Sequence, residues 1–343
     1  MKKDKSLKKI GVITSGGDSP GMNACIRAIV NTAWQDGIEV VGFRHGYRGI
    51  VEDFVQPLHP DDMRLVSQRG GTFLKSARYP EFREDDVAKA AAKNLTKHNV
   101  DGLIVIGGDG SFRGAYHLEK FWDGKIIGLP GTIDNDLAGT DTTIGFSTAV
   151  DTAMEAIDKV RETAEAMARV FIIEVMGRHA GFIGLHAAIA SAAEAMIVPE
   201  MEPQPNLSEL ADNIIQARTA FPDSSYIVVL SENLWPGGVH GLAENLGKST
   251  GVTCHACPLG HIQRGGRPNA QDRILAMQLG NAAVNAMLLG SHNVMIGLEN
   301  EHVVEVPLNL TFERDKPLDQ RLVDLQLSLQ GVNIASKEAN KTS

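Results

Sequence analysis

The sequence predicts an α/β protein in which helices cover parallel sheets. Short β-branched runs alternate with helical stretches along most of the 343 residues. Glycine is abundant, with 35 residues, whereas aromatic residues make up only 5% of the chain. This composition suits many short strands and helices joined by tight turns. A chain of this length can also form two domains.

The first strand–helix–strand unit sets the pattern. Residues 9–14 are a β-branched run, a helix is expected over 22–34, and 39–43 form the next strand. Strands joined by a helix pair in parallel. Further strands are predicted at 100–106, 125–129, 170–175, 196–199, 226–231 and 294–297. The other predicted helices cover 113–121, 147–168, 187–195, 207–220 and 273–288. Gly-rich loops crowd the first half, which suggests a domain boundary near residue 145.

The composition argues against several classes of protein. The net charge is -9 and no basic patch stands out, so nucleic acid is not an expected partner. No apolar stretch is long enough to span a bilayer, so no membrane association is expected. Three cysteines, Cys25, Cys254 and Cys257, fit a reducing, cytoplasmic compartment. Cys254 and Cys257 form a C-x-x-C, which could be a redox pair or half of a zinc site. No second Cys/His pair with ligand spacing lies nearby, so a structural role is favoured.

Two Gly-rich loops follow predicted strands, at the carboxyl edge of a parallel sheet where ligands bind. The first covers residues 14–21 and the second covers 107–111. Glycines let backbone N–H groups approach an anion, and the next helix offers the positive end of its dipole. The second loop also carries a carboxylate, Asp109, which suggests a phosphate bound together with Mg²⁺.

A third loop, residues 131–136, follows a strand and carries two carboxylates, Asp134 and Asp136. One can act as general base on a substrate hydroxyl while the other helps to hold a metal. Phosphoryl transfer further needs positive charge on the moving phosphate. Basic side chains beside Gly turns can supply that charge: Arg78, Arg178, His261 and Arg264.

Together these segments closely resemble the ATP-dependent 6-phosphofructokinase family over about residues 8–300. The resemblance implies a glycolytic kinase that transfers the γ-phosphate of ATP to the 1-hydroxyl of fructose 6-phosphate. It also implies two doubly wound, Rossmann-like α/β domains with the active site in the cleft between them. The nucleotide-binding domain would comprise 1–145 and about 263–313, the sugar-phosphate domain 146–262 and about 314–334, and 335–343 would be a disordered tail.

The resemblance also assigns roles to individual residues. Asp109 would serve Mg²⁺, and Asp134 would take the proton of the sugar hydroxyl, with Thr132 and Arg178 completing the catalytic set. The ATP site would be lined by Gly17, Tyr47, Ser76, Arg78, Gly108, Asp109, Gly110, Ser111 and Gly114. The sugar-phosphate site would be lined by Thr132, Asp134, Asp136, Arg169, Met176, Gly177, Arg178, Glu232, His255, His261 and Arg264.

Members of the family are typically homotetramers in which Arg169 would reach the 6-phosphate of a neighbouring subunit. A second arginine usually does the same, and its position falls on His255 here. The basic effector pocket of the bacterial enzymes is matched only by Arg27, Arg161 and the acid Glu194. Other basic positions of that pocket are replaced by Asn31, Phe54, Asp223 and Ser224. We therefore expect that this chain has lost the anion-binding effector site.

Two alternatives to an ATP-dependent kinase fit the same fold. Pyrophosphate-using relatives carry Asp where Gly110 stands and Lys where Gly131 stands, so the two glycines favour ATP. A non-catalytic sugar-phosphate sensor would not need to keep Asp109, Asp134 and Arg178. The preferred sugar stays open because of His255, and sedoheptulose 7-phosphate or tagatose 6-phosphate are the alternatives to fructose 6-phosphate.

Overall fold

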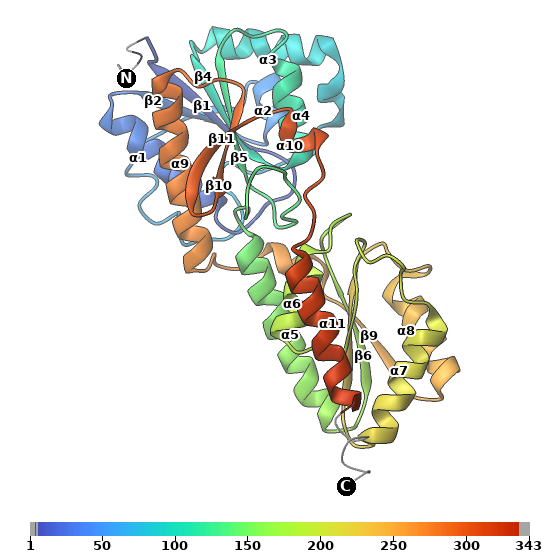
Figure 1. Ribbon diagram of the computed structural model, residues 1–343. Helices are drawn as coiled ribbons and strands as arrows, with labels where there is room; N and C mark the ends of the chain where they lie inside the picture. The colour runs from blue at the N-terminus through green and yellow to red at the C-terminus, as the bar shows by residue number, and fades with distance from the viewer. Residues whose placement is uncertain (1–3, 5, 336–343) are drawn as a thin grey trace. The chain divides into compact units, whose positions relative to one another are not determined.

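The computed structural model describes residue 4 and residues 6–335 (Figure 1). It divides into two compact units. The first runs up to Thr148 and includes Arg264–Lys316, and the second comprises Ala149–Gln263 and the chain from Pro317 onward. None of the described helices is both long and apolar enough to cross a membrane.

The first unit is built on a seven-stranded sheet of order β11-β10-β5-β4-β1-β2-β3. The five central strands are parallel, and β3 and β11 pair antiparallel at the two edges. The strands are β1 (Lys9–Thr14), β2 (Glu39–Phe43), β3 (Val55–Leu58), β4 (Gly102–Gly107), β5 (Lys125–Pro130), β10 (Val294–Glu299) and β11 (His302–Pro307).

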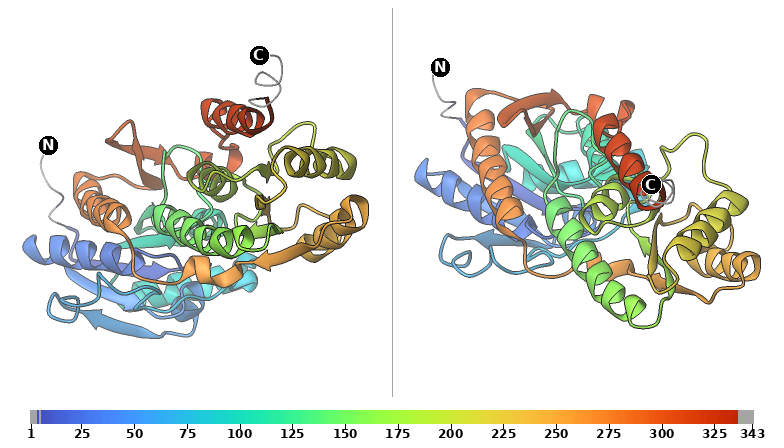
Figure 2. Two further views of the ribbon diagram at one scale, coloured as in Figure 1. Left: turned by 90° about the horizontal axis from the view of Figure 1, so that it is seen from below. Right: turned by 60° about the horizontal axis from the view of Figure 1, so that its bottom comes forward.

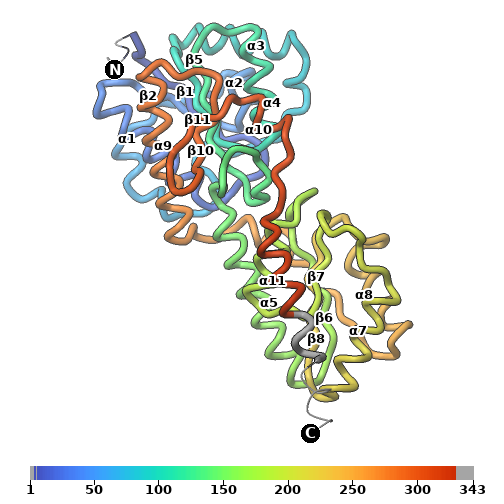
Figure 3. The backbone as a smooth tube through the Cα atoms, viewed as in Figure 1, coloured from blue at the N-terminus to red at the C-terminus, as the bar shows by residue number. Residues whose placement is uncertain are grey.

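Helices cover both faces of this sheet. Alternate strand residues point to opposite faces, so Ile104 and Ile106 join the core under α1 and α9, whereas Leu103 and Val105 join the core under α3 and α4. Figures 2 and 3 show α9 returning beside α1, although the two are far apart in sequence. The helices are α1 (Met22–Gln35), α2 (Tyr47–Val51), η1 (Pro80–Arg83), α3 (Asp85–Lys97), α4 (Asp109–Leu118), α9 (Ala270–Leu289) and α10 (Leu310–Glu313).

The second unit has a four-stranded parallel sheet of order β7-β8-β6-β9. Helices α7 and α8 pack on one face, and α5, α6 and α11 lie on the other (Figure 1). Its strands are β6 (Val170–Val175), β7 (Ala195–Ile197), β8 (Tyr226–Ser231) and β9 (Cys254–Pro258). Its helices are α5 (Phe146–Glu165), which begins in the first unit, α6 (Phe182–Ala190), α7 (Leu207–Ala220), α8 (Gly238–Thr250), η2 (Gly260–Arg264) and α11 (Gln320–Ala335).

The predicted α/β class and parallel sheets are confirmed, and β1, β2, β6, β8 and α7 have the predicted bounds. Two helices were placed wrongly. Helix α4 begins at Asp109 rather than at 113, because extended Gly108 turns the chain directly from strand to helix and the acid suits the first turn. Helix α6 ends at Ala190 before a left-handed Ala192, so the helix predicted over 187–195 covers only its last turn.

Several elements were not predicted at all: α2, β3, α3, α8, β9, β11, α10 and α11. Helix α11 ends at Ala335, the first residue of the expected disordered tail. The rest of that tail, 336–343, lies outside the described residues.

Candidate active site

Three loops meet at the carboxyl edge of the first unit's sheet. They follow β1, β4 and β5, which are neighbours in the sheet. Ser15 N donates to the Ile106 carbonyl at 3.0 Å, and Gly131 N donates to the Gly107 carbonyl at 3.0 Å. A Cβ at Gly108 would lie 3.4 Å from Thr132 Cβ. The phosphate-type loop and the carboxylate loop are therefore in contact.

The start of α4 forms the anion-binding part of this edge. Asp109 and Ser111 lie in its first turn, and Arg113 Nε donates to Asp109 Oδ1 at 2.8 Å one turn later. The backbone beside Gly110 is open, since nothing lies within 4 Å of a Cβ placed there. The free N–H groups of a helix start favour a phosphate at this point.

Tyr47 packs against α4 at Gly114, a residue of that helix. The Tyr47 side chain is only 4% exposed, its ring stacks on Phe82 with centroids 4.1 Å apart, and its hydroxyl donates to the Ser111 carbonyl. Burial raises the pKa of Tyr47, so the hydroxyl stays a donor. A Cβ at Gly114 would lie 2.9 Å from the Tyr47 ring. Both residues are expected in the ATP site. Tyr47 thus holds the start of α4 in position, and Gly114 leaves room for its ring.

Hydrogen bonds hold the segment 70–78 against the end of β1, the loop after it and the start of α1. Asn23 Oδ1 accepts from Phe73 N at 2.6 Å, and Thr14 Oγ1 donates to the Lys75 carbonyl at 2.8 Å. Ser76 Oγ donates to the Gly16 carbonyl at 2.5 Å. Sequence reasoning placed Thr14 in the first Gly-rich loop without this contact and missed Asn23, although a buried Asn in an otherwise apolar helix face is a usable signal.

Two of the expected basic residues, Arg78 and Arg264, lie in this unit. Arg78 is the last residue of the segment 70–78, and its side chain is exposed. Arg264 is expected in the sugar-phosphate site, and within this unit its guanidinium covers Gly17 in the first loop. Its Nη1 donates to the Asp18 carbonyl at 3.3 Å, and a Cβ at Gly17 would lie 2.5 Å from the same nitrogen.

The carboxylate loop is buried and held from several sides. Asp134 is 7% exposed, and its backbone N–H donates to Thr132 Oγ1 at 3.2 Å. Thr143 Oγ1 donates to the Thr132 carbonyl at 2.6 Å. Asn135, which lies between Asp134 and Asp136, has φ +55°.

Lys316 anchors this loop from a distant part of the chain. Its Nζ donates to Asn135 Oδ1 at 2.9 Å and to the Asp141 carbonyl at 3.0 Å. Burial lowers the pKa of Lys316 to about 8, while the carboxylates of Asp141 and Asp136 oppose that shift. Sequence reasoning missed Lys316, because no local pattern connects positions 181 residues apart.

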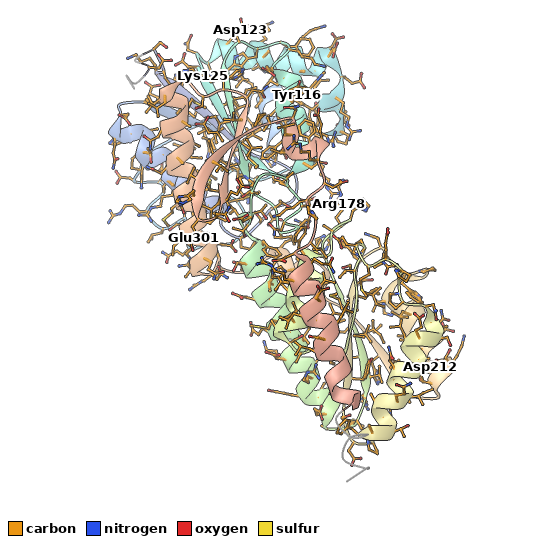
Figure 4. All side chains as sticks on the ribbon, viewed as in Figure 1. Tyr116, Asp123, Lys125, Arg178, Asp212 and Glu301 are labelled. Carbon is orange, nitrogen blue, oxygen red and sulfur yellow. The ribbon has the colours of Figure 1, made fainter. Side chains whose placement is uncertain are left out.

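The second unit has its own set of polar groups at the carboxyl ends of β6, β8 and β9, where Arg178 is labelled in Figure 4. Gly177 has φ +146°, and a Cβ there would lie 2.3 Å from the Ala180 carbonyl oxygen, so only glycine fits. Arg178 N donates to Glu232 Oε1 at 2.9 Å. His261 is exposed in η2 after β9.

Met176 and Gln263 complete this edge. Gln263 Oε1 accepts from Met176 N at 3.3 Å, and Gln263 Nε2 donates to the Gly260 carbonyl at 3.1 Å. The Gln263 side chain is fully buried, and sequence reasoning missed it. It links the turn after β6 to the turn after β9.

Arg169 and His255 lie at the other end of this sheet. Arg169 directly precedes β6 and Arg178 follows it. Six strand residues at ~3.3 Å each separate the two arginines by about 20 Å. His255 is at the start of β9, paired with Phe171. One chain therefore does not bring Arg169 and His255 together with Arg178.

The expected effector residues are engaged within their own units. Arg161 Nη1 donates to Glu194 Oε1 at 2.8 Å, and its Nη2 donates to the Ala192 carbonyl at 2.9 Å. Glu194 Oε2 also accepts from Ile227 N at 2.7 Å. Arg27 Nη1 donates to Ser67 Oγ at 3.3 Å. Arg161 therefore binds the backbone just after α6, and the Glu194 carboxylate balances its charge.

No group of three or more His, Cys, Asp or Glu side chains suited to a metal is found among the described residues. Asp109 lies in the first turn of α4, at the helix start where a phosphate is expected. A single carboxylate fits Mg²⁺ that keeps waters and substrate phosphates as its other ligands, as is usual for this ion.

Phosphate-type loops on parallel sheets, with a buried carboxylate beside one of them, define the chain as an α/β phosphotransferase. Residues 9–287 match the phosphofructokinase family, and the chain belongs to it. This confirms the predicted family.

Two relatives with curated names share this assignment. ATP-dependent 6-phosphofructokinase 1 of Thermus thermophilus is 48% identical over 320 residues, which are 93% of this chain and 98% of that protein. ATP-dependent 6-phosphofructokinase 2 of Bacteroides thetaiotaomicron is 42% identical with the same coverage. The solved phosphofructokinase of Saccharomyces cerevisiae matches with a TM-score of 0.81 at 30% identity, covering 96% of this chain. The present chain spans about half of that yeast chain, 48%.

Proposed function

We propose that the protein is a cytoplasmic, glycolytic ATP-dependent 6-phosphofructokinase. It would transfer the γ-phosphate of ATP to the 1-hydroxyl of fructose 6-phosphate, giving fructose 1,6-bisphosphate and ADP. The observation that carries this is the contact between the start of α4 and the buried loop of Asp134, where Gly108 meets Thr132. A phosphate cradle and a general base are thereby neighbours on one sheet edge.

The geometry around two glycines supports ATP as the donor. The space beside Gly110 is open, and an aspartate there would put a negative side chain into the space expected for the nucleotide. A Cβ at Gly131 would lie 2.8 Å from Ile106 Cγ2, so a lysine would not fit without rearrangement. The substitutions found in pyrophosphate-using relatives are therefore disfavoured here.

The residues divide the chemistry between them. Asp134 accepts the proton of the 1-hydroxyl as that oxygen attacks phosphorus, and Thr132 holds the Asp134 backbone in place. The N–H groups at the start of α4 hold the donor phosphates. Mg²⁺, held by Asp109, would neutralise charge on the phosphate oxygens. Arg178, His261 and the turn of Met176 and Gly177 would hold the sugar phosphate, with Glu232 fixing the Arg178 backbone.

We further propose that the sugar-phosphate site is shared between copies of the chain in a homotetramer. Arg169 and His255 lie at the sheet edge opposite to Arg178. They cannot reach a sugar held by the same chain's Arg178, so a 6-phosphate bound at this opposite edge would belong to a sugar held by another copy.

An assay of the purified protein tests the function. ATP or pyrophosphate is supplied with and without fructose 6-phosphate, and the bisphosphate product is measured. The expected result is bisphosphate product with ATP plus fructose 6-phosphate and none with pyrophosphate plus fructose 6-phosphate. Product from pyrophosphate would place the chain with the pyrophosphate-dependent enzymes, and no product from either donor would favour a sensor.

Co-expression tests the sharing. Chains carrying Asp134→Asn and Arg169→Ala are given different tags, and complexes holding both are purified. At low fructose 6-phosphate the mixed complexes should be far more active than either parent, because some sites combine an intact base with an intact arginine. Activity no higher than the parents' would show that each site is built from one chain.

A further inference from the structure

A basic cavity lies at the amino edge of the second unit's sheet. Its volume is about 370 Å³, and Arg169, Arg218 and His255 line it together with Met167 and the Gly251–Thr253 segment. No carboxylate is among its described lining residues. Two guanidinium groups facing one cavity without an acid favour a doubly charged anion such as a phosphate monoester.

Arg218 reaches this cavity from α7. One of its nitrogens, Nη1, donates to the Ala168 carbonyl, in the turn that leads into Arg169. That contact holds the guanidinium next to Arg169 and still leaves several N–H donors, because the group has five. No feature of the α7 sequence had marked Arg218 as a ligand.

His255 is poorly placed to act as the second cation. Its ring stacks on Phe171, with centroids 4.9 Å apart and planes at 26°. Its Nε2 is buried and has no hydrogen-bond partner among the described residues. The imidazole thus lies against Phe171, with Nε2 shielded from a ligand in the cavity.

We propose that Arg218 is the second cation of a phosphate-monoester site in this cavity, acting beside Arg169. It binds the 6-phosphate of a sugar phosphate held by another copy of the chain, the role that the family resemblance places at His255. The inference rests on the proposed function and extends its binding site by one residue.

The test compares Arg218→Gln with Lys248→Gln. Glutamine at 218 can still donate to the Ala168 carbonyl but carries no charge. Lys248 lies on α8 in an exposed pair with Glu244 and does not line the cavity, so its variant controls for loss of one positive charge from the unit. Each variant is assayed for turnover, titrated calorimetrically with fructose 6-phosphate, and checked for thermal stability.

Arg218→Gln should raise the KM and Kd for fructose 6-phosphate by roughly 10–100-fold, the loss expected for a hydrogen-bonded charge. The kcat, the KM for ATP and the melting temperature should stay near those of the wild type and of Lys248→Gln. In Arg218→Gln, a second change, His255→Arg, should recover part of the lost affinity.

Unchanged affinity in Arg218→Gln overturns the proposal, whether or not the melting temperature falls. An equal loss of affinity in Lys248→Gln also overturns it, because the effect would then be a general one of charge. If the wild type shows no turnover, the proposed kinase function is refuted, but the Arg218 proposal is still tested by the titration. A wild type that binds no fructose 6-phosphate refutes the Arg218 proposal as well.

Discussion

Lys316 holds the loop that carries the proposed base, and replacing it tests whether that loop must be held. Its two hydrogen bonds reach Asn135 and Asp141, on the loop and just after it. Asn135 sits in a left-handed conformation at φ +55°, which a side-chain anchor helps to maintain. We expect Lys316→Met to release the loop, and with it Asp134, without unfolding the protein.

Two opposing effects set the change in stability. Burial lowers the pKa of Lys316 from 10.5 to about 8. That depression corresponds to roughly 3 kcal/mol against the buried charge, and methionine removes it. Taking the donor away from Asn135 Oδ1 costs about 1–3 kcal/mol. The free energy of unfolding should therefore change by less than about 2 kcal/mol at neutral pH.

The change in activity should be much larger. A small misplacement of a reacting group lowers rates steeply, so kcat should fall by roughly 10–100-fold. Steady-state kinetics and urea unfolding measure the two quantities. Lys316→Arg, which keeps the charge and the donors, is the matched control and should keep most of the kcat. A Lys316→Met kcat within about twofold of the wild type would refute the anchoring role.

The pKa also fixes the sign of a pH effect. The folded pKa of Lys316, about 8, lies below the unfolded value of 10.5. Between these values the unfolded chain binds more protons, so this group makes the free energy of unfolding rise with pH. Below pH 8 the folded protein carries the full free-energy cost of burying the charged Lys316 side chain. The stability of the wild type relative to Lys316→Met should therefore increase as pH rises from about 8 toward 10.5.

Three further predictions follow from the site. Asp134→Asn should lower kcat by roughly 10²–10⁴-fold and leave fructose 6-phosphate binding intact; a variant that keeps most of its kcat would exclude Asp134 as the base. Gly110→Asp should raise the KM for ATP and leave the melting temperature unchanged, and unaltered ATP kinetics would place the nucleotide elsewhere. Phosphoenolpyruvate and ADP should barely shift half-saturation by fructose 6-phosphate, because Asp223 repels anions and Arg161 is already paired; a large shift would contradict this.

Local sequence patterns were enough to predict the bounds of strands whose residues are almost all buried. Strands β1, β6 and β8 are almost continuously buried, and their β-branched runs matched their bounds. Strand β9 is half-buried at the sheet edge and reads Cys-His-Ala-Cys-Pro, which carries no strand signal. Helix α11 has almost no amphipathic pattern, and its role depends on partners such as α6.

The candidate site residues Asp109, Asp134 and Arg178 could also be predicted from the sequence, because each follows a strand beside a Gly turn. The residues that contact the candidate site from distant parts of the chain are determined only by the tertiary structure. Lys316 meets Asn135 across 181 residues, and Arg218 meets Ala168 across 50. Such contacts depend on which strands are adjacent and on which end of a sheet each loop leaves. Neither is encoded in any local period, because hydrophobic periodicity specifies a buried face and not the partner that covers it.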